Sequence, residues 1–88
     1  MTIWKFPFGI REEFDIGMPE GAKILHVELQ GGEPHMWALV NPLSRREMRR
    51  FYVFGTGHTI HEKAGAHIGT LVFPGVDLVF HVFEEVAL

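Results

Sequence analysis

Apolar residues recur at every second position in short runs along this chain, and turn-forming residues separate the runs. Leu25, Val27 and Leu29, for instance, alternate with His26 and Glu28. Successive side chains of a β-strand point to opposite faces of a sheet, whereas an amphipathic helix repeats its apolar residues about every 3.6 positions. The alternation therefore predicts an all-β domain: a small antiparallel sandwich, or a partly open barrel, of about seven short strands.

Seven segments carry this alternation. The predicted strands are Ile3–Phe8, Phe14–Met18, Ala22–Gln30, Met36–Val40, Arg50–Phe54, His67–Phe73 and Leu78–Glu84. Pro7 indicates that the first strand lies at a sheet edge, because proline has no N–H to donate to a neighbouring strand. Ser44 and Glu47 fit a capping box, which predicts one helical turn before the fifth strand.

Two glycines set the geometry of the central hairpin. Gly31 and Gly32 predict a two-residue loop, because such turns need positive φ angles, which glycine adopts readily. With that loop, His26 lies opposite Trp37. A longer loop would shift the pairing register of the two strands.

The last two predicted strands, His67–Phe73 and Leu78–Glu84, carry apolar residues on both faces. A strand with one face in water usually alternates apolar with polar residues. These strands therefore either lie between two layers or turn their outer face towards another subunit. The second alternative predicts self-association.

Composition narrows the class of protein. Eighty-eight residues predict a single domain over residues 1–88, and the absence of cysteine excludes disulfides, thiolate metal ligands and a cysteine nucleophile. The formal net charge of −3 argues against binding to nucleic acid, for which a basic face is usual. We expect no signal peptide at Met1–Pro7, no membrane span and no cofactor, and hence a cytoplasmic protein.

The segment Gly55–Gly65 is a long loop rich in glycine and histidine, and it is the best candidate for a ligand site. Its glycines let backbone amides approach a ligand closely, and its hydroxyl and imidazole groups supply hydrogen bonds. The candidate ligand-binding residues in and beside it are Thr56, Gly57, His58, His61 and His67. The alternative is a plain connecting loop whose glycines meet unusual backbone angles.

Metal binding and catalysis are weaker hypotheses for the same segment. His58, His61 and His67 lie within ten positions, and Glu62 adds a carboxylate, a set that zinc accepts. However, no helix aligns them, so we predict solvated or capping histidines and no metal site. Ser44 is the only serine, and a triad built on a threonine near His58 would need the fold to bring in Asp77 or Glu62 as the orienting carboxylate, so we predict no enzymatic activity.

Arginine is concentrated in one short stretch: Arg45, Arg46, Arg49 and Arg50 make up half of the 8 basic residues. Guanidinium groups bind phosphates and carboxylates bidentately, so Arg45, Arg46 and Arg49 join the candidate ligand-binding residues. The alternative is a solvated, charged turn. Tyr52, close behind, could stack a base but reads more simply as core.

Six short segments stand out in order along the chain. They are Thr2–Phe6, Met18–Ala22, Trp37–Val40, Gly55–His58, His67–Thr70 and Leu78–Glu84. Together they resemble an uncharacterised family of small proteins found in phage and prophage genomes and scattered through bacteria. Thr59 departs from the proline that many members carry after the Gly-Thr-Gly-His segment. The resemblance implies a viral or mobile-element context and transfers no catalytic residue.

Three functions are compatible with these observations. The first is a non-enzymatic binding protein of phage origin, a homo-oligomer that engages a host protein or complex, such as a defence system. The second is a binder or sponge for a nucleotide signal, held by the loop and the arginines, with Trp37 or Tyr52 stacking on the base. The third is an accessory component of the virion.

Overall fold

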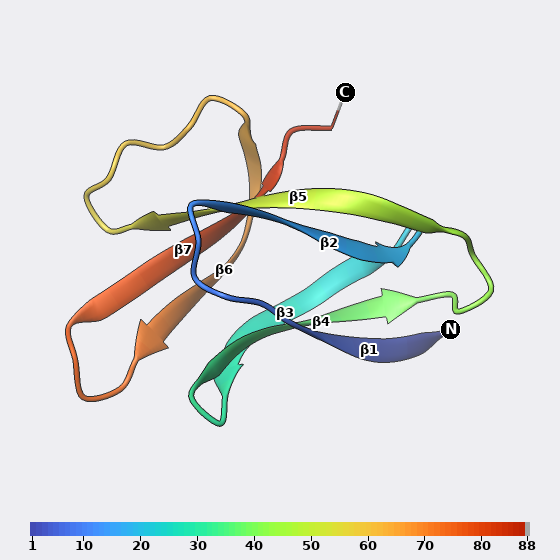
Figure 1. Ribbon diagram of the computed structural model, residues 1–88, viewed down its shortest axis with the longest axis horizontal. Helices are drawn as coiled ribbons and strands as arrows, with labels where there is room; N and C mark the ends of the chain where they lie inside the picture. The colour runs from blue at the N-terminus through green and yellow to red at the C-terminus, as the bar shows by residue number, and fades with distance from the viewer. Residues whose placement is uncertain (88) are drawn as a thin grey trace.

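The computed structural model describes residues 1–87 and contains seven β-strands in that range. They are β1 (Thr2–Pro7), β2 (Glu13–Pro19), β3 (Lys23–Gln30), β4 (Glu33–Val40), β5 (Arg46–Gly55), β6 (Ala64–Phe73) and β7 (Leu78–Glu85). Residues 1–87 include no helix that could cross a membrane. The predicted all-β fold of about seven strands is confirmed (Figure 1).

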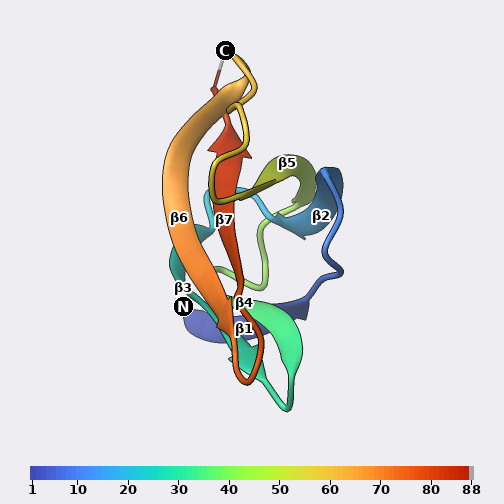
Figure 2. The same ribbon diagram turned by 90° about the vertical axis from the view of Figure 1, so that its left-hand side faces the viewer.

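The strands form two antiparallel sheets around one core. The three-stranded sheet has the order β1-β4-β3, and the four-stranded sheet has the order β2-β5-β7-β6. The sheets approach each other along β3 and β6 without sharing a ladder, so the fold is a sandwich and not a closed barrel. The molecule is a slab of 41 × 31 × 16 Å, and Figure 2 shows β6 beside β3 along one side of it.

The core lies between the inner faces of the two sheets and takes side chains from both. Met36 of β4, Phe51 of β5 and Val82 of β7 are fully buried in it. Trp4 and Phe6, two positions apart on the first strand, both pack into this core. A spacing of two along the sequence thus becomes a single apolar layer in space.

The central hairpin forms as predicted. Gly31 and Gly32 have φ angles of 60° and 80°, and His26 lies opposite Trp37. A β-bulge at Leu25, which the sequence did not predict, shifts the register of β3 and leaves this leucine exposed. The predicted shared face of the third strand is therefore broken at its start, because a bulge inserts one residue that has no partner across the ladder.

The predicted helical turn at Ser44–Glu47 is wrong. β5 already begins at Arg46, where it pairs with Pro19 of β2, and it is longer than the predicted fifth strand. Asn41 starts a turn instead, since its carbonyl accepts a hydrogen bond from the Ser44 N–H at 3.0 Å. A ladder along β2 satisfies more backbone groups than one capped helical turn could.

The connecting loop is shorter than predicted. β6 begins at Ala64 rather than His67, so the loop runs over residues 56–63. Two register irregularities interrupt the start of β6, between Ala64 and Gly69. They hide the alternation from which a strand is predicted, because each irregularity reverses the face to which the next residues point.

The outer strands of both sheets are protected against pairing with another chain. Pro7 ends β1, and β2 carries acidic side chains at Glu13 and Asp15. β3 and β6, the other two edges, lie against each other and both contain bulges. Charges, proline and bulges are the usual protection of a sheet edge. A partner is therefore more readily accepted on a face of this sandwich than at an edge.

Candidate functional site

The outer face of the four-stranded sheet carries aromatic and imidazole side chains that the core does not use. Phe54 lies opposite His81, and Phe83 opposite His67, and partners across a ladder point to the same side of the sheet. The ring centroid of Phe83 is 5.7 Å from that of Phe54 and 5.2 Å from that of His67. We call the surface formed by Phe54, His67, Thr70, His81 and Phe83 the imidazole–aromatic face.

A chain of hydrogen bonds crosses this face. Thr56 Oγ1 lies 2.8 Å from His81 Nε2, on one side of the imidazole ring. On the other side, His81 Nδ1 lies 3.1 Å from Thr70 Oγ1. The same Thr70 oxygen lies 2.9 Å from His67 Nε2. Hydroxyl groups thus lie within hydrogen-bond distance of both ring nitrogens of His81, which is half-buried. Within residues 1–87 no carboxylate bonds to this imidazole, the group that orients the histidine of a triad. These hydrogen bonds connect the start of the loop, at Thr56, to β6 and β7.

The loop over residues 56–63 folds back along β5. The ring of His58 lies against Gly55, with its Cε1 atom 3.0 Å from the position that a Cβ would take there. The ring of His61 stacks on Tyr52, with centroids 5.2 Å apart and planes only 8° from parallel. The two imidazoles therefore anchor the loop at separate points of the same strand.

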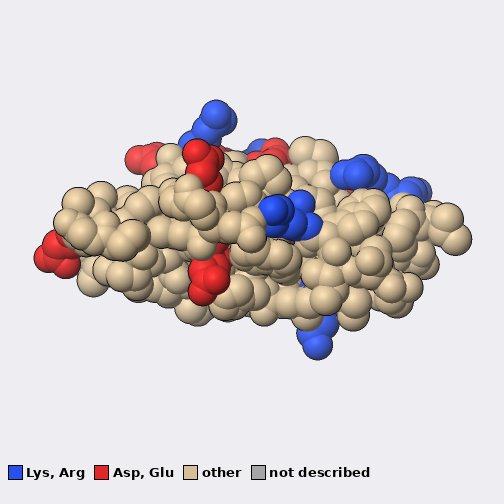
Figure 3. Space-filling model, turned by 90° about the horizontal axis from the view of Figure 1, so that it is seen from below, with Lys and Arg blue, Asp and Glu red and all other residues tan. Residues whose placement is uncertain are grey.

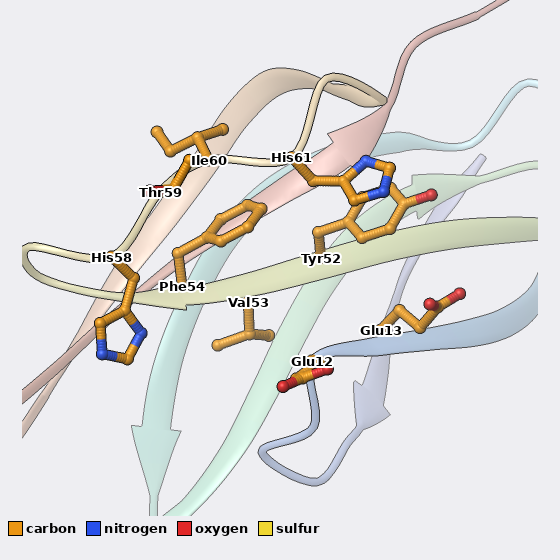
Figure 4. A pocket seen from close by; sticks show the side chains of 9 residues that line it. All are labelled: Glu12, Glu13, Tyr52, Val53, Phe54, His58, Thr59, Ile60 and His61. Atoms are coloured by element: carbon orange, nitrogen blue, oxygen red, sulfur yellow. The ribbon is translucent and has the colours of Figure 1, made fainter.

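A pocket of about 380 Å³ lies between this loop, β5 and the segment that leads into β2. Tyr52, Phe54 and His61 contribute an aromatic wall, and Glu12 and Glu13 contribute two carboxyl groups. Figure 4 shows His61 over the ring of Tyr52, with both glutamates across the pocket from them. No lysine or arginine is among its lining residues within the described chain. The pocket thus combines flat rings with negative charge.

The charges beside this pocket form a linked set. The phenol of Tyr52 donates a hydrogen bond to Glu85, and this bond, then burial and the charges of Glu85 and Glu13, raises the pKa of Tyr52. Arg50 holds Asp15 with two hydrogen bonds of 2.8 and 3.1 Å and approaches Glu13 at 3.4 Å. The bond from Arg50 lowers the pKa of Asp15. Two carboxylates, Asp15 and Glu13, therefore contact the Arg50 guanidinium, and the charge of Glu85 acts on it from nearby.

The structure brings most of the predicted loop residues together. The loop contains Thr56, Gly57, His58 and His61. Position 57 requires glycine because its φ angle is 91°. His67 lies on the sheet and bonds a threonine of its own strand. The histidines considered for zinc thus have separate partners. Over residues 1–87, no three histidine, aspartate or glutamate side chains meet in a way that could hold a metal ion.

The arginines lie elsewhere. Arg45 pairs with Glu20 at 2.8 Å, and Arg46 donates to a backbone carbonyl of β2. Arg49 forms a two-bond pair with Glu84, at 2.6 and 2.8 Å, and this hydrogen bonding raises its pKa. Each guanidinium is therefore already bound to a group of its own chain.

Arg46 begins β5 and Gly55 ends it, so Arg45 and Arg46 lie at the opposite end of a strand of about 30 Å from the loop, whereas Arg49 lies midway along the strand and is held by Glu84. The structure does not bring them into one site. Figure 3 shows charged side chains scattered over a largely uncharged surface on the side seen from below, with no broad basic patch there.

Sequence reasoning missed part of this site. The sequence pattern did not single out Glu12 or Glu13. It assigned Tyr52 to the core, and Tyr52 is indeed only 4% exposed, but it is buried beneath His61 on the outer side of the sheet. Residues 51–54 are all aromatic or aliphatic, so alternation cannot tell which two of them point inward. Only the pairing of β5 with β7 shows that Tyr52 and Phe54 face outward.

Comparison with known proteins identifies a family. The chain belongs to the family described as Domain of unknown function (DUF7352), which matches residues 1–87. No curated protein and no solved structure matches the chain.

Proposed function

We propose that this protein is a non-enzymatic binding protein that engages another protein through the imidazole–aromatic face. The observation that carries the proposal is the placement of Phe54 and Phe83 beside His67 and His81 on a face outside the core. Of the two alternatives for strands that are apolar on both faces, the proposal adopts the one in which the outer face meets a partner.

The chemistry of the face supports the proposal. Protein interfaces are enriched in aromatic side chains and depleted of charge at their centre. The row of aromatic and imidazole rings continues on β6 and β7 into Val72 and Val79, which lie opposite each other, and Val72 is 64% exposed. The protected sheet edges favour docking on this face over the addition of a strand.

The finer form of the proposal rests on the resemblance to phage and prophage proteins. In that form the protein acts in the cytoplasm of a host cell, self-associates, and binds a host protein or complex to blunt a defence system. The alternative of an accessory virion component is separated from it by mass spectrometry of purified particles, which would contain the protein only in that case.

The nucleotide-binder alternative gains less support. Phosphate groups would need free cations, but Arg45 and Arg49 are paired with Glu20 and Glu84. The pocket beside the loop is lined by carboxylates, which repel phosphate. A panel of cyclic and linear nucleotides in calorimetry tests this alternative directly, and binding heat would favour it.

The experiment compares two matched lysine substitutions. Val72→Lys places a charge on the imidazole–aromatic face, and Ile3→Lys places one on the outer face of the other sheet, where the side chain is 56% exposed. Both residues are β-branched, exposed and on outer strands. Each variant is cross-linked and recovered from a lysate of the host type, and its assembly state is measured by sedimentation.

We expect Val72→Lys to weaken recovery of partners, or self-association, about tenfold or more, because a charge would be buried in the contact. Ile3→Lys should behave like the wild type. Equal behaviour of the two variants would contradict the proposed use of this face.

A further inference from the structure

We infer that the pocket between the loop over residues 56–63 and Glu12–Glu13 receives an arginine side chain of the bound protein. The inference rests on the proposed function, since it names the chemistry of the partner. It follows from three properties of the pocket: its charge, its flat walls and the arginine that already lies beside it.

Charge is the first property. Glu12 and Glu13 line the pocket, and no lysine or arginine lines it. Glu13 has a partner in Arg50, at 3.4 Å, whereas Glu12 forms no ion pair with any residue that the structure describes. A cation entering the pocket would therefore meet a carboxylate that the chain leaves uncompensated.

Shape is the second property. His61 stacks on Tyr52, which is only 4% exposed, so the rings of His61 and Phe54 supply the flat walls of the pocket that a ligand can reach. A guanidinium group is planar and stacks on aromatic rings while its N–H groups bind carboxylates, whereas the compact ammonium of lysine cannot do both.

The chain itself provides the third argument. Arg50 lies next to the pocket and binds Asp15 and Glu13, so this corner of the molecule already holds one guanidinium between carboxylates. The hydrogen bond to Glu85 is the main cause that raises the pKa of Tyr52, and the charges of Glu85 and Glu13 add to it, which agrees with a negative potential at the aromatic wall. The same potential disfavours an anionic ligand.

The test uses the purified protein and a probe that stands for the side chain. N-acetylarginine methylamide is titrated into the labelled protein and followed by amide chemical shifts in NMR spectra. N-acetylcitrulline methylamide, which has nearly the same shape and no charge, and N-acetyllysine methylamide are titrated in parallel. The variants are Glu12→Gln and, as a matched control, Glu28→Gln, an exposed glutamate of the other sheet.

We expect the arginine probe to bind with an affinity of about millimolar and to shift resonances of the loop and of Phe54. The citrulline and lysine probes should bind at least about fivefold more weakly than the arginine probe. Glu12→Gln should weaken binding of the arginine probe by a similar factor, whereas Glu28→Gln should leave it unchanged. Spectra of the variants without probe show that both remain folded.

Equal shifts with arginine and citrulline, no shifts at the loop, or equal binding by Glu12→Gln would each overturn the inference. These outcomes involve the protein alone, so they leave the comparison of Val72→Lys with Ile3→Lys intact. Loss of the arginine pocket and loss of the proposed function are therefore separate results.

Discussion

Gly69 of β6 lies so close to Val27 of β3 that a Cβ atom on the glycine would stand 2.6 Å from the valine Cβ. This contact joins the two sheets at the edge where they approach each other, and Val27 is buried in the core there. The separation of the sheets at this edge is thus determined by the absence of a side chain at one position.

Replacing this glycine should push the sheets apart. We expect Gly69→Ala to lower the free energy of unfolding by about 1–3 kcal/mol, because the added methyl group meets the well-packed Val27 and cannot move aside. Urea denaturation measures the change. Gly9→Ala is the control, since a Cβ there meets nothing within 4 Å, and equal losses in both variants would contradict the packing argument.

The pair between Arg49 and Glu84 should contribute to stability, because its side chains are only 17% and 25% exposed. Arg49→Lys keeps the charge but loses the two-bond geometry and the bond to the Ala22 carbonyl. We expect a loss of about 1–3 kcal/mol in the free energy of unfolding.

The pair of Arg45 with Glu20 provides the comparison for that prediction, since the Arg45 side chain is 86% exposed. Arg45→Lys should change the free energy of unfolding by less than about 0.5 kcal/mol. Thermal and urea denaturation of both variants measure the change in the free energy of unfolding. A loss in Arg45→Lys as large as that in Arg49→Lys would contradict the greater contribution of the less exposed pair.

Acid should remove one stabilising interaction of β2. The pKa of Asp15 in the folded protein is lowered below the ordinary value of 3.8 by its bond to Arg50, so the unfolded chain takes up the proton first. The stabilisation is therefore present above about pH 4 and is lost as the pH falls through the folded-state pKa. Urea midpoints of wild type and Asp15→Asn, measured from pH 5 to pH 2, should converge on the acid side. A difference between the two urea midpoints that stays constant over this pH range would contradict the stabilising role of the Asp15–Arg50 pair.

Tyr52 is the only tyrosine of the chain, so the absorbance of phenolate reports on it alone. Because its hydroxyl bonds to Glu85, its pKa should lie above the ordinary value of 10.0 and return towards it in Glu85→Gln. Stabilisation from this bond is complete below about pH 10 and is lost as the pH rises through the folded-state pKa. An ordinary titration in the wild type would refute the hydrogen bond.

Local chemistry predicted much of the fold. The two-residue turn at Gly31 and Gly32 follows from the φ angles that glycine allows, and the edge position of β1 follows from Pro7. The capping box at Ser44 and Glu47 is local too, but pairing of β5 with β2 overrides it. Short-range preferences are reliable where no long-range ladder competes for the same backbone groups.

The candidate site was only half predictable. The loop histidines and glycines could be recognised because their composition is unusual for a connection between strands. Glu12 could not, since it lies 40 positions before Tyr52 in the sequence and meets it only through the pairing of β2 with β5. The negative charge of the pocket is therefore a property of the strand order.

The sequence by itself determined that this chain forms strands and turns, because alternation, glycine and proline act on neighbouring residues. It also determined that no cysteine chemistry is available. The tertiary structure alone decided which face of β5 turns outward, how the loop stacks His61 on Tyr52, and which arginines form ion pairs with carboxylates. These depend on contacts between distant segments, and an alternating pattern carries no information about which strand lies beside which.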